Sequence, residues 1–174
     1  MLGALTSATV VPDGGIYVAG HPIALRAETE LLIEVGDDVA AEASPDDVRA
    51  AIAGVGLALE LVDVGDPHSD LEQVVAGDVF HRAVVLGIGR CPAEAASADA
   101  TLAVAGRVHR PDRPLPDLVQ AVRDAAELLE RGGERLLAGD LLLTGSLVHV
   151  PVGRGDEVVA EIAGLGRVSV SIDP

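Results

Sequence analysis

The scarcity of aromatic side chains is the feature of this sequence that most restricts how it can fold. The 174 residues include one Phe, one Tyr and no Trp, although 49% of the chain is hydrophobic. A sizeable core can therefore be buried, but it has to be built from Ala, Val, Leu and Ile. The same scarcity argues against binding of single-stranded nucleic acid, because such proteins stack bases on aromatic rings.

The charge of the chain is strongly acidic. The formal net charge is −16, and all 12 basic residues are Arg, because the sequence contains no Lys. Such a surface repels phosphate backbones and anionic lipids, so we expect neither nucleic acid nor membrane as a partner. No apolar run approaches the roughly 20 residues that span a bilayer. An acidic surface does suit cations, so the carboxylates have to be divided into solubilising and functional ones.

A single cysteine, Cys91, leaves no internal disulfide and no zinc site built from several cysteines. We therefore expect a reduced, cytoplasmic setting.

Short predicted strands outnumber predicted helices along the chain. Helices are expected over 45–53, 69–75 and 117–131, and strands over 16–19, 27–35, 57–64, 83–87, 101–108 (broken at Gly106), 141–144, 157–162 and 167–172. No repeat or low-complexity linker divides the sequence, so residues 1–174 are expected to form one domain. The pattern predicts an α+β fold with a mostly β core and a few peripheral helices.

Two glutamates in the predicted strand 27–35 are the first candidates for chemistry. Glu28 and Glu30 are two residues apart, so on a strand they share one face with Cα atoms roughly 7 Å apart. Glu60 lies in an apolar stretch, where a buried carboxylate needs a partner. Three carboxylates without cysteine ligands favour Mg²⁺ or Mn²⁺. The alternative is that Glu28, Glu30 and Glu34 form the solvated face of an amphipathic strand.

The last third of the chain carries three ordered motifs. They are GDLLLTGS at 139–146, GDEVVAEI at 155–162 and GLGRVSVSI at 164–172. In this order they resemble the closing strands of the fumarylacetoacetate hydrolase superfamily, most of all its branch of 2-oxopent-4-enoate hydratases and 4-oxalocrotonate decarboxylases.

The resemblance extends upstream over almost the whole chain. RAETELLIEVGD at 26–37 is similar to the strand that carries two metal carboxylates in that superfamily, and ALELVD at 58–63 to the segment with the third. Shorter similarities are LTS at 5–7, PDGG at 12–15 and VVLG at 84–87. The resemblance implies a mixed β-roll or sandwich, with Glu28, Glu30 and Glu60 binding the metal. It also implies a lyase, either a hydratase or a decarboxylase, that acts on a small 2-oxo acid or its enol through a metal-stabilised enolate.

The sequence also departs from the pattern of this superfamily. The catalytic lysine of the hydratases would fall near Leu2, and the chain has no lysine. The stretch that reads ADNAS in the superfamily is replaced by AGDVFH at 76–81, which makes His81 a candidate for the missing proton-transfer group. His149 is the second candidate, and Asp13 matches a residue near the active site of the superfamily.

Three further residues are candidates for holding the substrate. Arg82 could bind a substrate carboxylate through two hydrogen bonds, and Thr144 and Ser146 form a small polar loop. The alternative for His81 and Arg82 is a surface pair that precedes a strand. Asp63 should point to the opposite strand face from Glu60, and either support a metal ligand or play a structural role.

The lost lysine keeps a second function open. The chain could be a divergent relative without hydratase activity, either a non-catalytic partner subunit or a tailoring enzyme for another acyl substrate. The resemblance further implies assembly as a homo-oligomer or with a related subunit.

Overall fold

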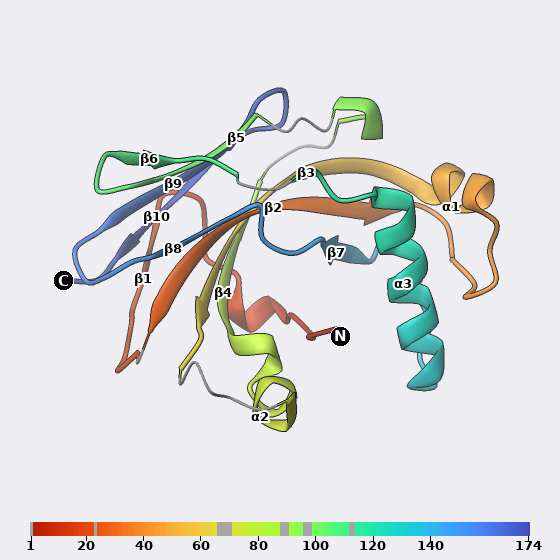
Figure 1. Ribbon diagram of the computed structural model, residues 1–174, viewed down its shortest axis with the longest axis horizontal. Helices are drawn as coiled ribbons and strands as arrows, with labels where there is room; N and C mark the ends of the chain where they lie inside the picture. Colours follow the sequence, from red (N-terminus) through yellow and green to blue (C-terminus); the bar gives the residue numbers. More distant parts are fainter. Residues whose placement is uncertain (1, 23, 66–70, 88–90, 96–98, 112–113) are drawn as a thin grey trace.

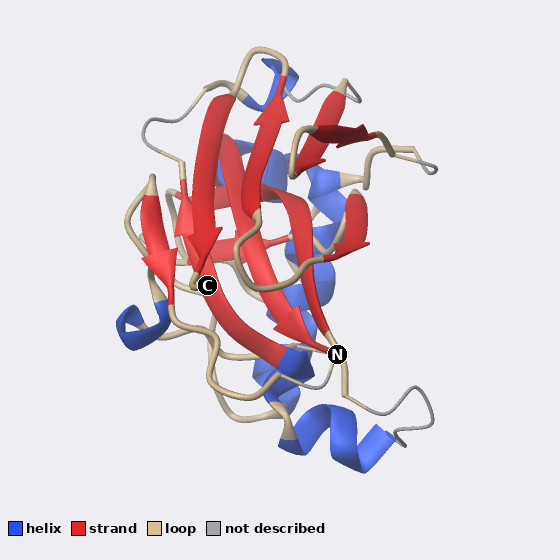
Figure 2. Ribbon diagram, turned by 90° about the vertical axis from the view of Figure 1, so that its left-hand side faces the viewer, coloured by secondary structure: helices blue, strands red, loops and turns tan. Residues whose placement is uncertain are grey.

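The computed structural model describes residues 2–22, 24–65, 71–87, 91–95, 99–111 and 114–174. Two five-stranded sheets dominate it (Figures 1 and 2). The first sheet has the order β4-β3-β2-β7, and β8 pairs with β2 further along the same edge. Its strands are β2 (Leu25–Val35), β3 (Ile52–Asp63), β4 (His81–Leu86), β7 (Leu141–Leu143) and β8 (Val148–Pro151).

The second sheet has the order β1-β10-β9-β5-β6. Its strands are β1 (Gly15–Tyr17), β5 (Ala100–Val104), β6 (Arg107–His109), β9 (Glu157–Ile162) and β10 (Gly166–Ile172). All its pairings are antiparallel except that of β1 with β10. The mostly β architecture expected from the sequence is therefore confirmed.

Helices are few and lie at the periphery. They are α1 (Pro45–Ala51), α2 (Leu71–Ala76), α3 (Leu118–Arg131) and the 3₁₀ turns η1 (Ser7–Thr9), η2 (Asp78–Phe80) and η3 (Ala93–Ala95). Ser44 caps α1 by accepting a hydrogen bond from the Asp47 amide, and Asp117 caps α3 through the Gln120 amide. None of the helices in the described part of the chain has the length and hydrophobicity that a transmembrane span requires.

One face of the long strands β2 and β3 carries the core. Toward one end of these strands it packs against the second sheet, through residues such as Ala27, Leu31, Leu59, Val158 and Ile162. Toward the other end, Ile33, Val35 and Val55 pack against α1 and α3. Figure 1 shows β2 and β3 curving across the molecule between these two regions. The core is thus aliphatic, as the composition requires.

The opposite face of β2 and β3 is covered only in part. Leu32, Ala58 and Val84 form a small buried cluster there. The N-terminal segment runs alongside, since the Val11 amide donates to the Val84 carbonyl at 2.9 Å and Val10 pairs with Val84 in a parallel bridge. This second face is where the candidate site lies.

Several element boundaries differ from the sequence prediction. The helix predicted over 45–53 ends at Ala51, and β3 begins at Ile52, five residues before the predicted strand. The strand predicted over 101–108 is a hairpin, because Ala105 and Gly106 have positive φ and form a tight turn. β8 was not predicted. The helix predicted over 69–75 begins outside the described residues, and the described part is α2.

Candidate metal centre

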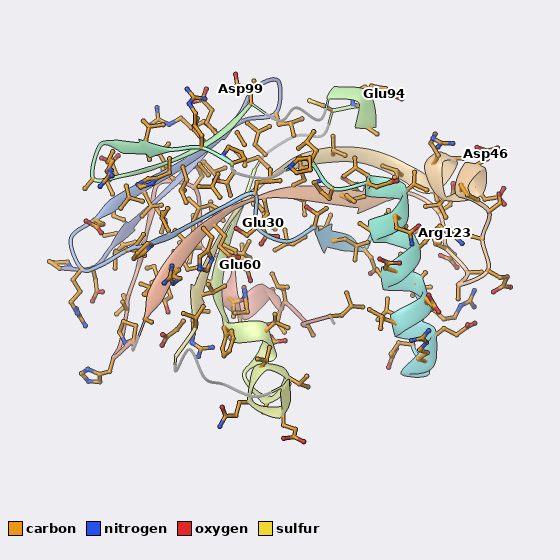
Figure 3. The ribbon with its side chains drawn as sticks, viewed as in Figure 1. Glu30, Asp46, Glu60, Glu94, Asp99 and Arg123 are labelled. Carbon is orange, nitrogen blue, oxygen red and sulfur yellow. The ribbon has the colours of Figure 1, made fainter. Side chains whose placement is uncertain are left out.

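Three glutamates from two neighbouring strands converge on one point. Glu28 and Glu30 are two residues apart on β2, and Glu60 lies on β3, whose antiparallel register brings it alongside. One carboxylate oxygen from each lies within 4.8 Å of the others. Figure 3 shows Glu30 and Glu60 near the middle of the molecule, whereas Asp46, Glu94 and Asp99 lie at its periphery. The structure thus brings together the three carboxylates expected to bind metal.

Glu30 is the most buried member of this carboxylate trio, with 2% of its surface exposed. Its Oε2 accepts a hydrogen bond of 2.9 Å from the Gly145 amide. Burial, followed by the nearby charges of Glu60 and Glu28, raises the pKa of Glu30 well above its usual value of 4.5. A cation among the three carboxylates would offset the repulsion between their negative charges.

Two histidines flank the trio. His149 on β8 places Nδ1 against Oε1 of Glu28, and its side chain is 37% exposed. His81, at the start of β4, places Nδ1 2.6 Å from Oε1 of Glu60 and Nε2 2.8 Å from the Thr9 hydroxyl. Both histidines suggested by the sequence therefore contact a predicted metal ligand, but only His81 is buried and bonded through both ring nitrogens.

The polar loop between β7 and β8 lies over Glu30. The Thr144 amide donates to the Leu31 carbonyl at 3.1 Å, and the Leu147 amide donates to the Thr29 carbonyl at 2.8 Å, which anchors both ends of the loop to β2. Oγ1 of Thr144 and Oγ of Ser146 are buried, and neither has a hydrogen-bond partner among the described residues. Because buried hydroxyls are normally bonded, these two are available to a ligand.

Asp13 and Arg82 have contacts away from the trio. Asp13 accepts hydrogen bonds from the Ser169 amide at 2.7 Å and from its hydroxyl at 3.3 Å, which fixes the turn before β1 onto β10. Arg82 donates to the His81 carbonyl and lines a hollow with Tyr17 and Asp63. No contact among the described residues links either side chain to the three glutamates.

Asp63 lies on the other face of β3 from Glu60, as expected, because the two are three residues apart on one strand. Its carboxylate accepts a hydrogen bond of 2.7 Å from the Ala24 amide and so has a structural role at the start of β2.

Two contacts of the site could not be anticipated from the sequence. Thr9 lies in an N-terminal turn more than seventy residues before His81, and no local pattern links the two. Gly145 contributes only its backbone amide, which carries no side-chain signal. The only indirect indication that Gly145 belongs to the site was its position between Thr144 and Ser146, both candidates for substrate binding.

The donor set of the trio fits a hard divalent cation. Carboxylate oxygens are the ligands that Mg²⁺, Mn²⁺ and Ca²⁺ prefer in proteins, and the group of possible ligand atoms found here consists of carboxylates alone. No arginine among the described residues forms an ion pair with Glu28, Glu30 or Glu60. The negative charge of the site is therefore uncompensated by arginine.

Comparison with known proteins gives consistent results. The model of the fumarylacetoacetate (FAA) hydrolase C-terminal family matches residues 3–173. A 4-oxalocrotonate decarboxylase of Pseudomonas sp is 28% identical over 97% of this chain and 69% of the relative. The 2-keto-4-pentenoate hydratase 1 of Dechloromonas aromatica (strain RCB) is 33% identical over 96% of this chain and 67% of the relative.

A solved structure extends the similarity to three dimensions. The 4-oxalocrotonate decarboxylase from Pseudomonas putida G7, complexed with magnesium and adipate, has a TM-score of 0.82 and 25% identity, over 98% of this chain and 68% of that one. The same enzyme complexed with calcium and acetate gives a TM-score of 0.83 and 26% identity over the same shares. On the family match and this shared fold, the chain belongs to the fumarylacetoacetate hydrolase family.

Proposed function

We propose that this protein is a divalent-metal-dependent lyase, a hydratase or a decarboxylase, that acts on a small 2-oxo acid or its enol. The observation that carries the proposal is the carboxylate trio, whose three ligand atoms lie within 4.8 Å of one another around the buried Glu30. Relatives named decarboxylase and hydratase, one of them solved with magnesium, support the same class of reaction.

Glu28, Glu30 and Glu60 would hold Mg²⁺ or Mn²⁺. Bound there, the cation would supply positive charge that favours chelation of the 2-oxo carboxylate and formation of its enolate. The contribution of the protein is to fix the ligands before the cation arrives. β2 and β3 are paired along the whole stretch that carries the trio, and the Gly145 amide holds one oxygen of Glu30.

The loop between β7 and β8 would bind the substrate. The unpartnered hydroxyls of Thr144 and Ser146 lie on either side of Gly145, whose amide contacts Glu30. They can donate hydrogen bonds to the carboxylate or the 2-oxo oxygen of a ligand held at the trio. A 2-oxo acid offers both kinds of acceptor within one small molecule.

We assign proton transfer to His149 rather than to His81. Each histidine contacts one glutamate through Nδ1, but Nε2 of His81 is also occupied, by Thr9. Among the described residues nothing bonds Nε2 of His149, and this side chain is partly exposed. A general acid or base needs a nitrogen within reach of the substrate, which favours His149. His81 then orients Glu60, and Arg82 and Asp13 take no direct part.

A second function has one specific observation in its favour. The sequence contains no lysine, so the amine expected from the resemblance to hydratases is absent. A divergent member that binds metal without hydratase activity, as a non-catalytic subunit or as a tailoring enzyme on another acyl substrate, would agree with this.

Exchange of substrate hydrogen with solvent distinguishes these two functions. The protein is incubated in D₂O with Mn²⁺ or Mg²⁺ and 2-oxo acids of three to eight carbons, and deuterium at C3 is followed by NMR. A lyase that forms an enolate should exchange at least one of these acids faster than the metal alone does. Metal binding without exchange above the metal blank across the whole panel would favour the divergent, non-hydratase member.

A further inference from the structure

We propose that Thr9 is a positioning residue of the metal centre, acting through His81 on Glu60. This inference rests on the proposed metal site and adds a residue from outside the two strands that carry the ligands. Thr9 belongs to the short turn η1 near the N-terminus, yet its hydroxyl lies 2.8 Å from Nε2 of His81. His81 in turn contacts Oε1 of Glu60 at 2.6 Å.

Hydrogen-bond accounting fixes the direction of this chain of contacts. The Glu60 carboxylate can only accept a hydrogen bond, so Nδ1 of His81 must carry the hydrogen that lies between them. Nε2 of the neutral ring is then an acceptor, and the Thr9 hydroxyl, which lies within reach of both Nε2 and the Thr6 carbonyl, donates its one hydrogen to Nε2. The Thr6 carbonyl keeps its bond from the Thr9 amide, and the imidazole ring is held at both ends.

Thr9 is itself held firmly beside His81. Its amide donates to the Thr6 carbonyl at 3.1 Å, and the next residues bond to β4, where the Val11 amide meets the Val84 carbonyl at 2.9 Å. A second hydrogen bond joins the N-terminal segment to η2, just before β4, because the Ala4 amide donates to Oδ1 of Asp78 at 2.8 Å. The turn is thus attached to the strand that begins with His81.

The consequence is a preset orientation for the Glu60 carboxylate. With Oε1 held by His81, its second oxygen is left for a cation shared with Glu28 and Glu30. Groups that orient a metal ligand typically change metal affinity by 10- to 100-fold when they are removed. Loss of the Thr9 hydroxyl should therefore weaken metal binding although Thr9 touches none of the three glutamates.

The test compares Thr9→Val, which removes the hydroxyl at nearly constant shape, with Thr9→Ser, which keeps it. Mn²⁺ affinity is measured by calorimetry on the whole chain, and the ring nitrogens of His81 are followed by ¹⁵N NMR in metal-free protein. We expect Thr9→Val to bind Mn²⁺ about tenfold more weakly, and Thr9→Ser to stay within about twofold of wild type. Ser7→Ala, in the same turn, is the control and should match wild type.

The NMR measurement separates this inference from the metal proposal. Wild-type His81 should show a hydrogen on Nδ1 and a hydrogen-bonded Nε2, and Thr9→Val should shift the Nε2 signal. Equal Mn²⁺ affinity in wild type and Thr9→Val, or an unchanged His81 signal, would overturn the role of Thr9. Failure of wild type to bind Mn²⁺ would overturn the metal site itself. Thr9→Ala serves as a second variant if Thr9→Val does not fold.

Discussion

Glu28 and Glu60 stand directly opposite each other in the antiparallel register of β2 and β3. Like charges at such paired positions destabilise a sheet, because their side chains leave the backbone only about 5 Å apart. Glu30, on the same face, adds a third carboxylate that is almost fully buried. His81 and His149 contact Glu60 and Glu28, and no arginine among the described residues pairs with the trio, so we propose that a cation offsets the remaining negative charge.

Divalent cations should stabilise the folded protein through the trio. A ligand that binds only the folded state adds about 2.7 kcal/mol at a hundredfold excess over its Kd, so Mg²⁺ or Mn²⁺ should raise the Tm by roughly 5–10 °C. Glu30→Gln removes one charge at nearly constant shape and keeps an oxygen for the Gly145 amide. It should melt at or above wild type without metal and show little further shift with it, as measured by calorimetry.

Glu34→Gln is the matched control for that experiment. Glu34 lies on β2 four residues beyond Glu30, on the same strand face, but outside the trio. It should keep the full metal-induced shift. If both variants respond to Mn²⁺ as wild type does, the three glutamates are an ordinary acidic strand surface.

The stability gained by Glu30→Gln should depend on pH. Below the usual value of 4.5, Glu30 is protonated in the folded and the unfolded chain, so the charge adds no penalty. Above it, the unfolded chain ionises first, since the folded pKa is raised, and wild-type stability falls until the pH passes that raised pKa.

Urea unfolding with a chelator, from pH 4.5 to 8, measures this effect. The advantage of Glu30→Gln over wild type should be near zero at the acid end and grow to about 2 kcal/mol at neutral pH, the scale expected for an unpaired buried charge. A difference that stays constant over the whole range would show that Glu30 titrates normally.

Removing the two unpartnered hydroxyls should leave stability intact but weaken substrate binding. A buried hydroxyl without a partner contributes nothing to the fold, so Thr144→Val and Ser146→Ala should change the free energy of unfolding by less than about 0.5 kcal/mol. Their KM for a reactive 2-oxo acid should rise about tenfold. Steady-state kinetics and urea unfolding give the two quantities.

Thr29→Val is the control for these hydroxyl variants. Thr29 is fully buried, and its hydroxyl donates to the Thr101 carbonyl at 3.1 Å. Its loss should cost about 1 kcal/mol. A comparable cost for Thr144→Val would mean that the Thr144 hydroxyl has a structural partner after all.

Replacing the two histidines should affect different quantities, kcat for His149 and Mn²⁺ affinity for His81. His149→Ala should lower kcat by about 10², because it removes the proton-transfer group, and should leave Mn²⁺ affinity within a few fold. His81→Ala should instead weaken Mn²⁺ binding by 10- to 100-fold and recover much of its rate at saturating metal. A 10² loss confined to His81→Ala at saturating Mn²⁺ would return proton transfer to His81.

Asp13 and Arg82 should prove dispensable for the chemistry. Asp13→Ala breaks the two bonds to Ser169 and should lower the Tm by about 2 °C, with Mn²⁺ affinity unchanged. Arg82→Ala should bind the reactive acid as wild type does, because within the described part of the chain its guanidinium contacts the His81 carbonyl and not the trio. A substrate KM that rises about tenfold in Arg82→Ala, measured by steady-state kinetics, would instead identify Arg82 as a substrate ligand.

The carboxylate trio was predictable because its signal is local. Glu28 and Glu30 share a strand face by spacing alone, and Glu60 stood out as an acid in an apolar stretch. The position of Glu60 beside Glu28 depends on the register between β2 and β3, and this register cannot be predicted from the sequence pattern of the two strands. The resemblance to a family supplied that link, and the structure agrees with it.

Other features failed for identifiable physical reasons. The helix predicted over 45–53 was extended too far, because β3 already begins at Ile52 and continues through Gly54, which pairs with Glu34. β8 went unrecognised because His149 and Pro151 interrupt a very short apolar run, and its strand state depends on pairing with β2. The sequence did not indicate that His81 contacts the trio while its neighbour Arg82 does not. The ladder of β3 and β4 is irregular between Leu61 and Val62, opposite these two residues, so simple strand alternation does not apply there.

The edge partner of β2 is divided between β7 and β8, and the gap between them falls beside Glu30. Residues 144–147 join two short strands that are each separately paired with β2, and of these four residues only Leu147 belongs to the hydrophobic core. Under the proposed function, changes at residues 144–146 would alter which small acid is accepted while the carboxylate trio on β2 and β3 stays in place. Under the proposed function, this separation offers a simple route to new substrates, because residues 144–146 can diverge while the two paired strands and Leu147 keep the scaffold unchanged.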